Sequence, residues 1–89
     1  MTRQGRHKAV ALKYRADKDR APRVVAKGNG HLAEKIVEMA KANDVPLHSD
    51  QNLADLLDAL GIDMEIPPEL YRAVAEVLAF IYRLNREVI

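Results

Sequence analysis

The chain has 89 residues, no cysteine and a formal net charge of +1, with 48% hydrophobic and 30% charged residues. This length and composition predict a single folded domain with a modest core and argue against a disordered chain. The absence of cysteine excludes disulfides, thiolate metal sites and a cysteine nucleophile, and no apolar run approaches the roughly 18 residues of a membrane span, so we expect a cytoplasmic protein.

The N-terminal part predicts a short arm followed by two strands. Residues 1–8 are polar and basic without periodicity, which predicts a flexible basic arm, with one domain over residues 9–89. Residues 9–14 (AVALKY) are almost continuously apolar, which is typical of a strand buried on both faces. Residues 23–27 (RVVAK) contain two β-branched valines and predict a second strand. The charged loop between them is short enough for an antiparallel hairpin.

Residues 31–43 change to a helical period. One face of this helix carries the apolar residues that we expect to be buried: Leu32, Ile36, Met39 and Ala40. The short, mainly apolar segment 44–47 predicts a third strand, so that strand, helix and strand form a βαβ unit with a right-handed crossover and parallel strands. Pro46 indicates that this strand is short or lies at the edge of the sheet.

Two further helices follow. Ser49 or Asp50 can cap the first of them, and Gly61 is placed to end it. Its expected buried stripe consists of Leu53, Leu56, Leu57 and Leu60. Pro67 and Pro68 begin the last helix, because a missing N–H costs little there. The expected stripe of the last helix consists of Leu70, Val74, Val77, Ile81 and Leu84, with Tyr71 and Leu78 beside it.

Together these elements predict the α/β fold class. We expect a small mixed β-sheet of about three to four strands, in which a hairpin is followed by a βαβ unit, packed against three or four helices. The sequence contains no internal repeat and no low-complexity tract, so it gives no sign of a second domain.

The sequence predicts no active site, cofactor site or metal site. Gly28, Asn29 and Gly30 lack the spacing of a phosphate-binding loop and predict a tight turn with a glycine at positive φ. The three histidines lie in three different elements, which does not favour a metal site. We therefore expect no catalytic residue, no cofactor, no metal and no small-molecule substrate, and a protein that is not an enzyme.

The small net charge hides a strong asymmetry. Residues 1–27 carry nine basic and two acidic residues, whereas the remainder carries five basic and eleven acidic ones. A basic first third is typical of binding to nucleic acid, to an acidic membrane surface or to an acidic protein, and equally of solvated strand and loop faces. Tyr14 is the only aromatic residue there, a poor platform for stacking nucleic-acid bases. A small nucleic-acid-binding module that uses this basic third is the alternative function.

Several motifs occur in an order that resembles a known family. They are residues 9–14 (AVALKY), residues 21–28 (APRVVAKG), Val45-Pro46 after the first helix, Ile66-Pro67 before the last helix, and residues 70–79 (LYRAVAEVLA) within it. In this order they resemble the C-terminal cytoplasmic domain of the flagellar export-switch protein FlhB and its counterparts in virulence type III secretion systems. The resemblance covers about residues 7–84, nearly the whole chain.

This resemblance implies a compact α/β domain whose small sheet is surrounded by helices and which is attached to a membrane-embedded export gate. It also implies binding of export substrates and of a length-control protein, and a role in switching the gate from early to late substrates. In the family an Asn-Pro-Thr-His motif precedes the first strand of this segment. The chain cleaves itself after the asparagine of that motif by forming a five-membered succinimide.

This chain departs from the cleavage motif, because its four positions are occupied by Gln4, Gly5, Arg6 and His7, of which only His7 matches. Gln4 has one more methylene group than asparagine and would have to close a slower six-membered ring. Gly5 lacks the constraint that proline gives to the scissile bond. We therefore expect that the chain does not cleave itself and that His7 is an exposed arm residue.

A second departure concerns the strand and the membrane domain that precede the motif in the family. The sequence starts three residues before Gln4, so we expect a stand-alone homologue of the cleavage fragment, with an open strand edge at Ala9, Val10, Leu12 and Tyr14. The expected partners of this edge are export-gate components, export substrates, the length-control protein or a second copy of the chain. We expect the domain to replace or modulate the C-terminal part of a full-length paralogue in substrate switching, in the cytoplasm or at the cytoplasmic face of the inner membrane.

Overall fold

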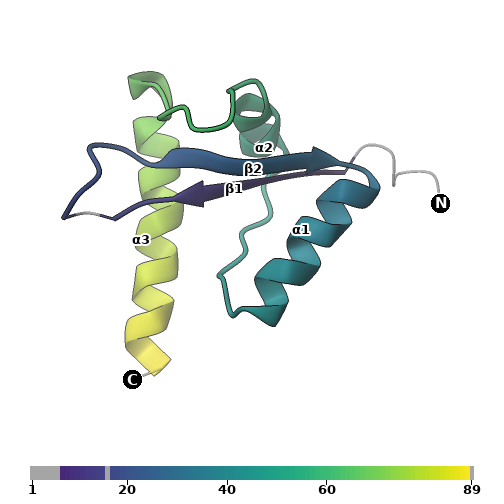
Figure 1. Cartoon of the computed structure of the whole chain (residues 1–89). Helices are drawn as coiled ribbons and strands as arrows, with labels where there is room; N and C mark the ends of the chain where they lie inside the picture. Colours follow the sequence, from purple (N-terminus) through teal and green to yellow (C-terminus); the bar gives the residue numbers. More distant parts are fainter. Residues whose placement is uncertain (1–6, 16, 89) are drawn as a thin grey trace.

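The computed structural model describes residues 7–15 and 17–88, with side chains up to Ile81. Its elements follow in the order β1 (Lys8–Lys13), β2 (Arg23–Asn29), α1 (His31–Ala42), α2 (Gln51–Asp58), a 3₁₀ turn (Pro68–Leu70) and α3 (Tyr71–Val88). Figure 1 shows the two strands crossing in front of α3, with α1 leading away from the end of β2. The strand β1 begins at Lys8, so the last residue of the predicted arm belongs to the sheet, while residues 1–6 lie outside the described ones. None of the described helices combines the length and the apolar character that a membrane span requires.

The strands β1 and β2 form the predicted antiparallel hairpin. The register is regular from Lys8 to Ala11. Beyond it Val25 is an extra residue in β2, because Leu12 pairs with Val24. Such a β-bulge bends the strand and increases its twist just before the hairpin loop.

The two faces of the hairpin carry side chains of different size. Because neighbouring residues of a strand point to opposite faces, Val10 and Leu12 share one face of β1, and Ala9 and Ala11 share the other. Val10 and Leu12 pack against a core that includes residues of α2 and α3. On the opposite face Gly28, the partner of Ala9, meets the first turn of α1. The alternation of large and small residues thus lets α2 and α3 pack on one face and α1 approach closely on the other.

The apolar core lies between the hairpin, α2 and α3. Its clustered buried residues come from four separate parts of the chain: Ala21, Leu57, Ile66 and Val74. Val24 of β2 is fully buried as well. Half-buried residues pack around the cluster: Val10, Leu12, Leu53, Leu60, Leu70 and Leu78. The core is therefore aliphatic and small, and each of its residues carries a large share of the stability.

The predicted third strand does not form within the described residues, so the predicted βαβ unit and mixed sheet are wrong: the sheet has two antiparallel strands. The backbone of Asp44 adopts a positive φ of 58° after α1, and the N–H of Val45 donates back to the carbonyl of Ala40 at 2.8 Å. Pro46 has no N–H to offer to a neighbouring strand. The chain therefore leaves α1 in a turn and continues to α2 without a strand partner. The α/β class, the hairpin and three α-helices are confirmed.

The helix α1 agrees with the predicted range to within one residue but buries a different face. Its buried residue is Ala33, whereas Leu32 and Met39 are 54% and 66% exposed. The other two residues of the predicted stripe are half-buried. The side of the helix that faces the hairpin thus runs through Ala33, Ile36 and Ala40. The first turn of α1 meets Gly28 through the side chain of Leu32, which stays more than half exposed.

In α2 the N-terminal cap is confirmed and the C-terminal one is wrong. Asp50 is the N-cap, and its carboxylate accepts a hydrogen bond from the N–H of Leu53 at 3.0 Å. The helix ends at Asp58, before the predicted terminating residue Gly61. Gly61 does not have a positive φ, since Gly30 is the only described glycine that does. The left-handed residue that would close the helix is thus missing.

The stripes of the last two helices are confirmed only in part. In α2 Leu57 is buried, Leu53 and Leu60 are half-buried, and Leu56 is 54% exposed. A 3₁₀ turn that begins at Pro68 leads into α3. Along α3, Val74 is buried, most of the remaining stripe is half-buried, and Tyr71 is exposed. The side chain of Leu84 lies outside the described ones.

A lysine from the hairpin closes the C-terminus of α2. Lys27 donates from Nζ to the carbonyl oxygens of Asp58 and Leu60, both at 2.7 Å. A cation in this position satisfies free carbonyls at the helix end and interacts favourably with the helix dipole. It therefore replaces the glycine cap that the sequence predicted, and it joins β2 to α2.

Replacing Lys27 with methionine is expected to lower the free energy of unfolding by about 1.5–3 kcal/mol, because both carbonyls lose a charged donor. Methionine retains most of the apolar stem. Urea unfolding followed by circular dichroism measures the change. The matched control is Lys35→Met on the exposed side of α1, which should stay within about 0.5 kcal/mol of the unmodified chain. Equal effects of the two substitutions would contradict the capping role.

Candidate functional site

The positions of the cleavage motif lie at the start of the hairpin. Gln4, Gly5 and Arg6 lie outside the described residues. His7 is exposed, as predicted, and directly precedes β1. Its carbonyl accepts a hydrogen bond from the N–H of Gly30 at 3.0 Å. His7 is thus held by its backbone at the end of the hairpin, next to the turn that leads into α1.

This hydrogen bond fixes which backbone groups of β1 face outward. In an antiparallel pair, residues joined by hydrogen bonds alternate with residues that are not. Because the pair of His7 and Gly30 is a bonded one, Ala9 and Ala11 direct their N–H and C=O groups toward β2. The backbone groups of every second residue point away from β2: Lys8, Val10 and Leu12. No described residue donates to or accepts from these outward groups.

The other edge of the sheet is covered near the hairpin loop. The N–H of Val24 donates to the carbonyl of Met64 at 3.0 Å, and the carbonyl of Val24 accepts from Asp63 at 2.7 Å. The N–H of Ile66 donates to the carbonyl of Pro22 at 2.9 Å. The chain itself therefore pairs with the first part of β2. The outer edge of β1 is the strand edge that this part of the fold leaves open.

The structure divides the predicted edge residues into three groups. Val10 and Leu12 belong to the open edge by their backbone, while their side chains pack on the core. Ala9 directs its backbone toward β2 and cannot pair with an outside segment. Tyr14 lies beyond the end of the strand and is 42% exposed. Lys8, which the sequence assigned to the arm, is the edge residue that the prediction missed, since a charged first residue carries no strand signal.

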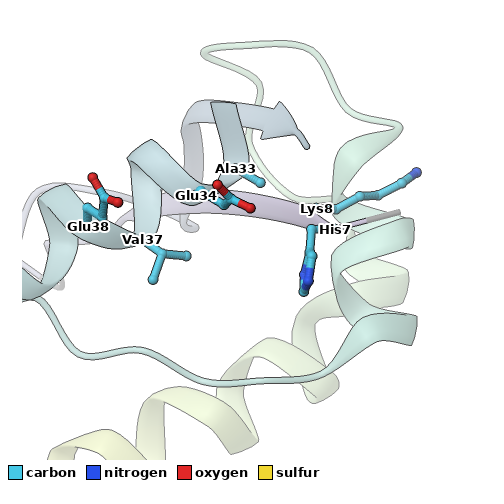
Figure 2. A pocket seen from close by; sticks show the side chains of 6 residues that line it. All are labelled: His7, Lys8, Ala33, Glu34, Val37 and Glu38. Carbon is cyan, nitrogen blue, oxygen red and sulfur yellow. The ribbon is translucent and has the colours of Figure 1, made fainter. Parts of the chain in front are cut away.

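A shallow groove opens beside the start of this edge. Its volume is about 300 Å³, and it is lined by His7, Lys8, Ala33, Glu34, Val37 and Glu38. Figure 2 shows the four side chains of α1 projecting beside the first residues of β1, whereas Lys8 extends away from α1. An outside segment that pairs with β1 would run past this groove. The residues from α1 could not be predicted, because only the packing of α1 on the hairpin brings them to the edge.

Lys8 ties the edge to α2. Its Nζ lies 3.2 Å from a carboxylate oxygen of Asp58 and 3.5 Å from one of Asp55. The hydrogen bond to Asp58, then the charge of that carboxylate, and further the charge of Asp55 raise the pKa of the Lys8 ammonium above its ordinary value. The ammonium therefore stays charged at neutral pH and directs the Lys8 side chain toward α2, away from the groove.

The chemistry that this site offers is binding. Outward N–H and C=O groups recognise an extended segment through backbone hydrogen bonds, and neighbouring grooves select its side chains. Among the described residues, no three histidine, aspartate or glutamate side chains come together in a way that could hold a metal ion. The turn at Gly28, Asn29 and Gly30 contains a glycine with a φ of 59°, as the sequence predicted.

Comparison with known proteins finds relatives over nearly the whole chain. Residues 4–81 match the model of the FlhB, HrpN, YscU and SpaS family. The chain is 48% identical to the uncharacterized protein YlqH of Bacillus subtilis over 81 residues, which are 91% of this chain and 87% of that protein. It is 45% identical over 83 residues to the flagellar biosynthetic protein FlhB of Aquifex aeolicus, which are 92% of this chain and 24% of that protein. The chain thus spans about a quarter of the length of this FlhB.

Solved structures show the same architecture. The cytoplasmic domain of FlhB from Shewanella putrefaciens superimposes with a TM-score of 0.85 at 38% identity, covering 91% of this chain and 64% of that one. The PscU C-terminal domain superimposes with a TM-score of 0.80 at 30% identity, covering 84% of this chain and 96% of that one. These comparisons confirm the predicted fold class and the resemblance that the motifs indicated.

Proposed function

Because the chain belongs to the FlhB, HrpN, YscU and SpaS family, we propose that it is a binding module of the flagellar or type III protein export apparatus and that it catalyses no reaction. The family match over residues 4–81 carries this proposal. Gln4 and Gly5 in place of the asparagine and proline of the cleavage motif support the absence of self-cleavage.

The proposed partners are components of the export gate, export substrates or the length-control protein. In substrate switching, the chain acts alongside or in place of the matching domain of a full-length relative. The extent of the match supports this role, since it covers most of YlqH but only about a quarter of FlhB. The place of action is the cytoplasmic side of the inner membrane, where the export gate opens.

The proposed mode of binding is strand addition to the outer edge of β1. The outward backbone groups of Lys8, Val10 and Leu12 give an extended partner segment its hydrogen bonds, and the groove beside α1 receives its side chains. A two-stranded sheet is marginal by itself and gains from a third strand. We therefore expect the partner segment at this edge to be a strand and not a helix. A second copy of the chain can supply such a strand.

The proposed function is tested by binding to purified proteins. The chain is immobilised and offered the cytoplasmic parts of the export-gate proteins, an export substrate and the length-control protein, each in a separate experiment. We expect at least one of them to be retained. Sedimentation velocity of the chain alone tests pairing of two copies. Retention of none, together with a strictly monomeric chain, would overturn the proposal.

Replacing Val10 with proline is expected to weaken partner binding at least tenfold while the fold survives. The N–H of Val10 points outward, so proline removes a hydrogen-bond donor that only a partner would use. Affinities from calorimetry and thermal unfolding by circular dichroism measure the two effects separately. A folded Val10→Pro variant with unchanged affinity would contradict binding at this edge while leaving the family role intact.

The control for this experiment is proline at the neighbouring residue. The N–H of Ala9 points toward β2, so Ala9→Pro removes a hydrogen bond within the hairpin and is expected to destabilise the fold by about 1–3 kcal/mol. Val10→Pro should be clearly the more stable of the two variants. If Ala9→Pro were the more stable variant, the N–H of Ala9 and not that of Val10 would point outward.

A further inference from the structure

The loop end of the hairpin carries a cluster of exposed cations. Four residues there are basic and exposed, and together they are called the basic tip: Lys13, Arg15, Lys18 and Arg20. Figure 1 shows this loop at the end of the strands that is opposite to α1, projecting beyond α3. The basic tip therefore lies away from the groove beside α1 and is accessible when that groove is occupied.

The charge of the basic tip is poorly compensated within the fold. Asp19 is engaged by the loop itself: its carboxylate accepts from the backbone N–H of Arg15 at 2.8 Å and lies 3.8 Å from the guanidinium of Arg23. None of the four cations forms an ion pair with a described acidic residue. Asp17 is the one remaining carboxylate in the loop. Residues 13–20 thus carry four basic and two acidic side chains, and the loop keeps a positive balance.

Hydrogen bonds order the backbone of the turn that carries Arg15 and Lys18. The carbonyl of Arg15 accepts hydrogen bonds from the N–H groups of Lys18 and Asp19, at 2.9 and 2.7 Å. The N–H of Arg15 in turn donates to the Asp19 carboxylate, so both backbone groups of Arg15 are hydrogen-bonded within the turn. The backbone of this turn therefore loses little conformational freedom when the loop binds a partner. Beside it the ring of Tyr14 is 42% exposed, and tyrosine is favoured where water meets lipid headgroups.

We propose that the basic tip binds the headgroups of anionic lipids. A projecting convex loop can bring all its cations to a flat anionic surface, and each lysine or arginine near such a surface adds attraction. Double-stranded nucleic acid is read by elements that enter a groove, and single strands need several stacking side chains. The tip offers neither. The inference rests on the proposed function only in placing the domain beside the inner membrane, and it gives the domain a defined orientation there.

The test is sedimentation with large unilamellar vesicles at low ionic strength. We expect binding to vesicles of phosphatidylglycerol and phosphatidylcholine, none to vesicles of phosphatidylcholine alone, and loss of binding as salt is added. The triple variant Lys13→Ala, Lys18→Ala, Arg20→Ala should lower the partition coefficient about a hundredfold, since each charge contributes about a factor of five. The control removes the same charge from exposed helical positions: Lys35→Ala, Lys41→Ala and Arg72→Ala.

The outcomes separate the sources of binding. Equal losses in the two triple variants would show attraction to net charge alone and overturn the assignment to the tip. Binding of duplex DNA or RNA through the tip, without binding of anionic vesicles, would also overturn the lipid assignment. Val10→Pro should retain vesicle binding, because Val10 lies outside the tip. Failure of the lipid experiment therefore leaves the proposed export role standing, and failure of the protein-binding experiment leaves the lipid site standing.

Discussion

Replacing Leu57 with alanine is expected to lower the free energy of unfolding by about 2–5 kcal/mol. Leu57 is 5% exposed and belongs to the buried cluster that joins α2 to the hairpin and α3. Alanine would leave a cavity at this junction, and the three elements cannot all close around it. Because a domain is stable by only about 5–15 kcal/mol in total, the variant should unfold at a much lower urea concentration.

The neighbouring leucine provides a matched control. Leu56 lies in the same helix and is 54% exposed, so Leu56→Ala should cost less than about 1 kcal/mol. Helix propensity changes equally in the two variants, which isolates the effect of burial. Urea unfolding followed by circular dichroism gives both values. Similar losses at the two positions would mean that α2 presents a different face to the core.

Replacing Gly28 with alanine is expected to cost about 1–3 kcal/mol, because the new methyl group has no room. A Cβ at this position would lie 2.5 Å from Cγ and 2.9 Å from Cβ of Leu32. Leu32 can change its rotamer to move Cγ, but its Cβ is fixed by the backbone of α1. The helix must therefore move away from the hairpin. We expect a lower urea midpoint and faster amide exchange in the first turn of α1.

Two other glycines separate crowding from backbone strain. Gly30 has open space around it but a φ of 59° and a ψ of −126°, so Gly30→Ala should cost about 1–3 kcal/mol through the backbone alone. A Cβ at Gly61 meets only the flexible end of Met64, at 3.3 Å, and φ there is not positive. Gly61→Ala should therefore be neutral or slightly stabilising. A loss at Gly61 equal to that at Gly28 would contradict this account.

The face of α1 shows why a periodic pattern can select the wrong residues. The prediction favoured Leu32 and Met39 because their spacing places them on one apolar stripe, but Ala33 is the buried residue. What decides is how the helix packs on the hairpin, where Leu32 contacts Gly28 and stays more than half exposed while Ala33 is buried. The sequence of a helix does not contain the shape of its neighbour. The same reason explains why α2 buries Leu57 and not Leu56.

The third strand shows how an apolar segment depends on a partner. The apolar residues Val45 and Leu47 were consistent with a strand, yet both are about half exposed, at 53% and 49%. A strand forms only where another strand supplies hydrogen bonds, and no described segment lies beside this one in the sheet. Its apolar character alone could not place it.

The candidate site was predictable as a strand with an open edge, but the groups that a partner meets there were not. The apolar run of β1, the turn at Gly30 and the family motifs could all be recognised in the sequence. The sequence could not tell that Val10 faces outward with its backbone and Ala9 inward, since this depends on the hydrogen bond between Gly30 and His7. Nor could it bring Glu34 and its neighbours on α1 to the groove.

The sequence by itself determined the class of the fold, the hairpin, the three helices and the family, because these follow from local periodicity and from motifs in a fixed order. The absence of a complete cleavage motif is also a property of the sequence alone, visible in Gln4 and Gly5. Only the tertiary structure decided which side of each helix is buried and which backbone groups of the open strand edge face outward. Burial and pairing are relations between segments far apart in the chain, so they arise only when the hairpin, α1 and α2 pack together.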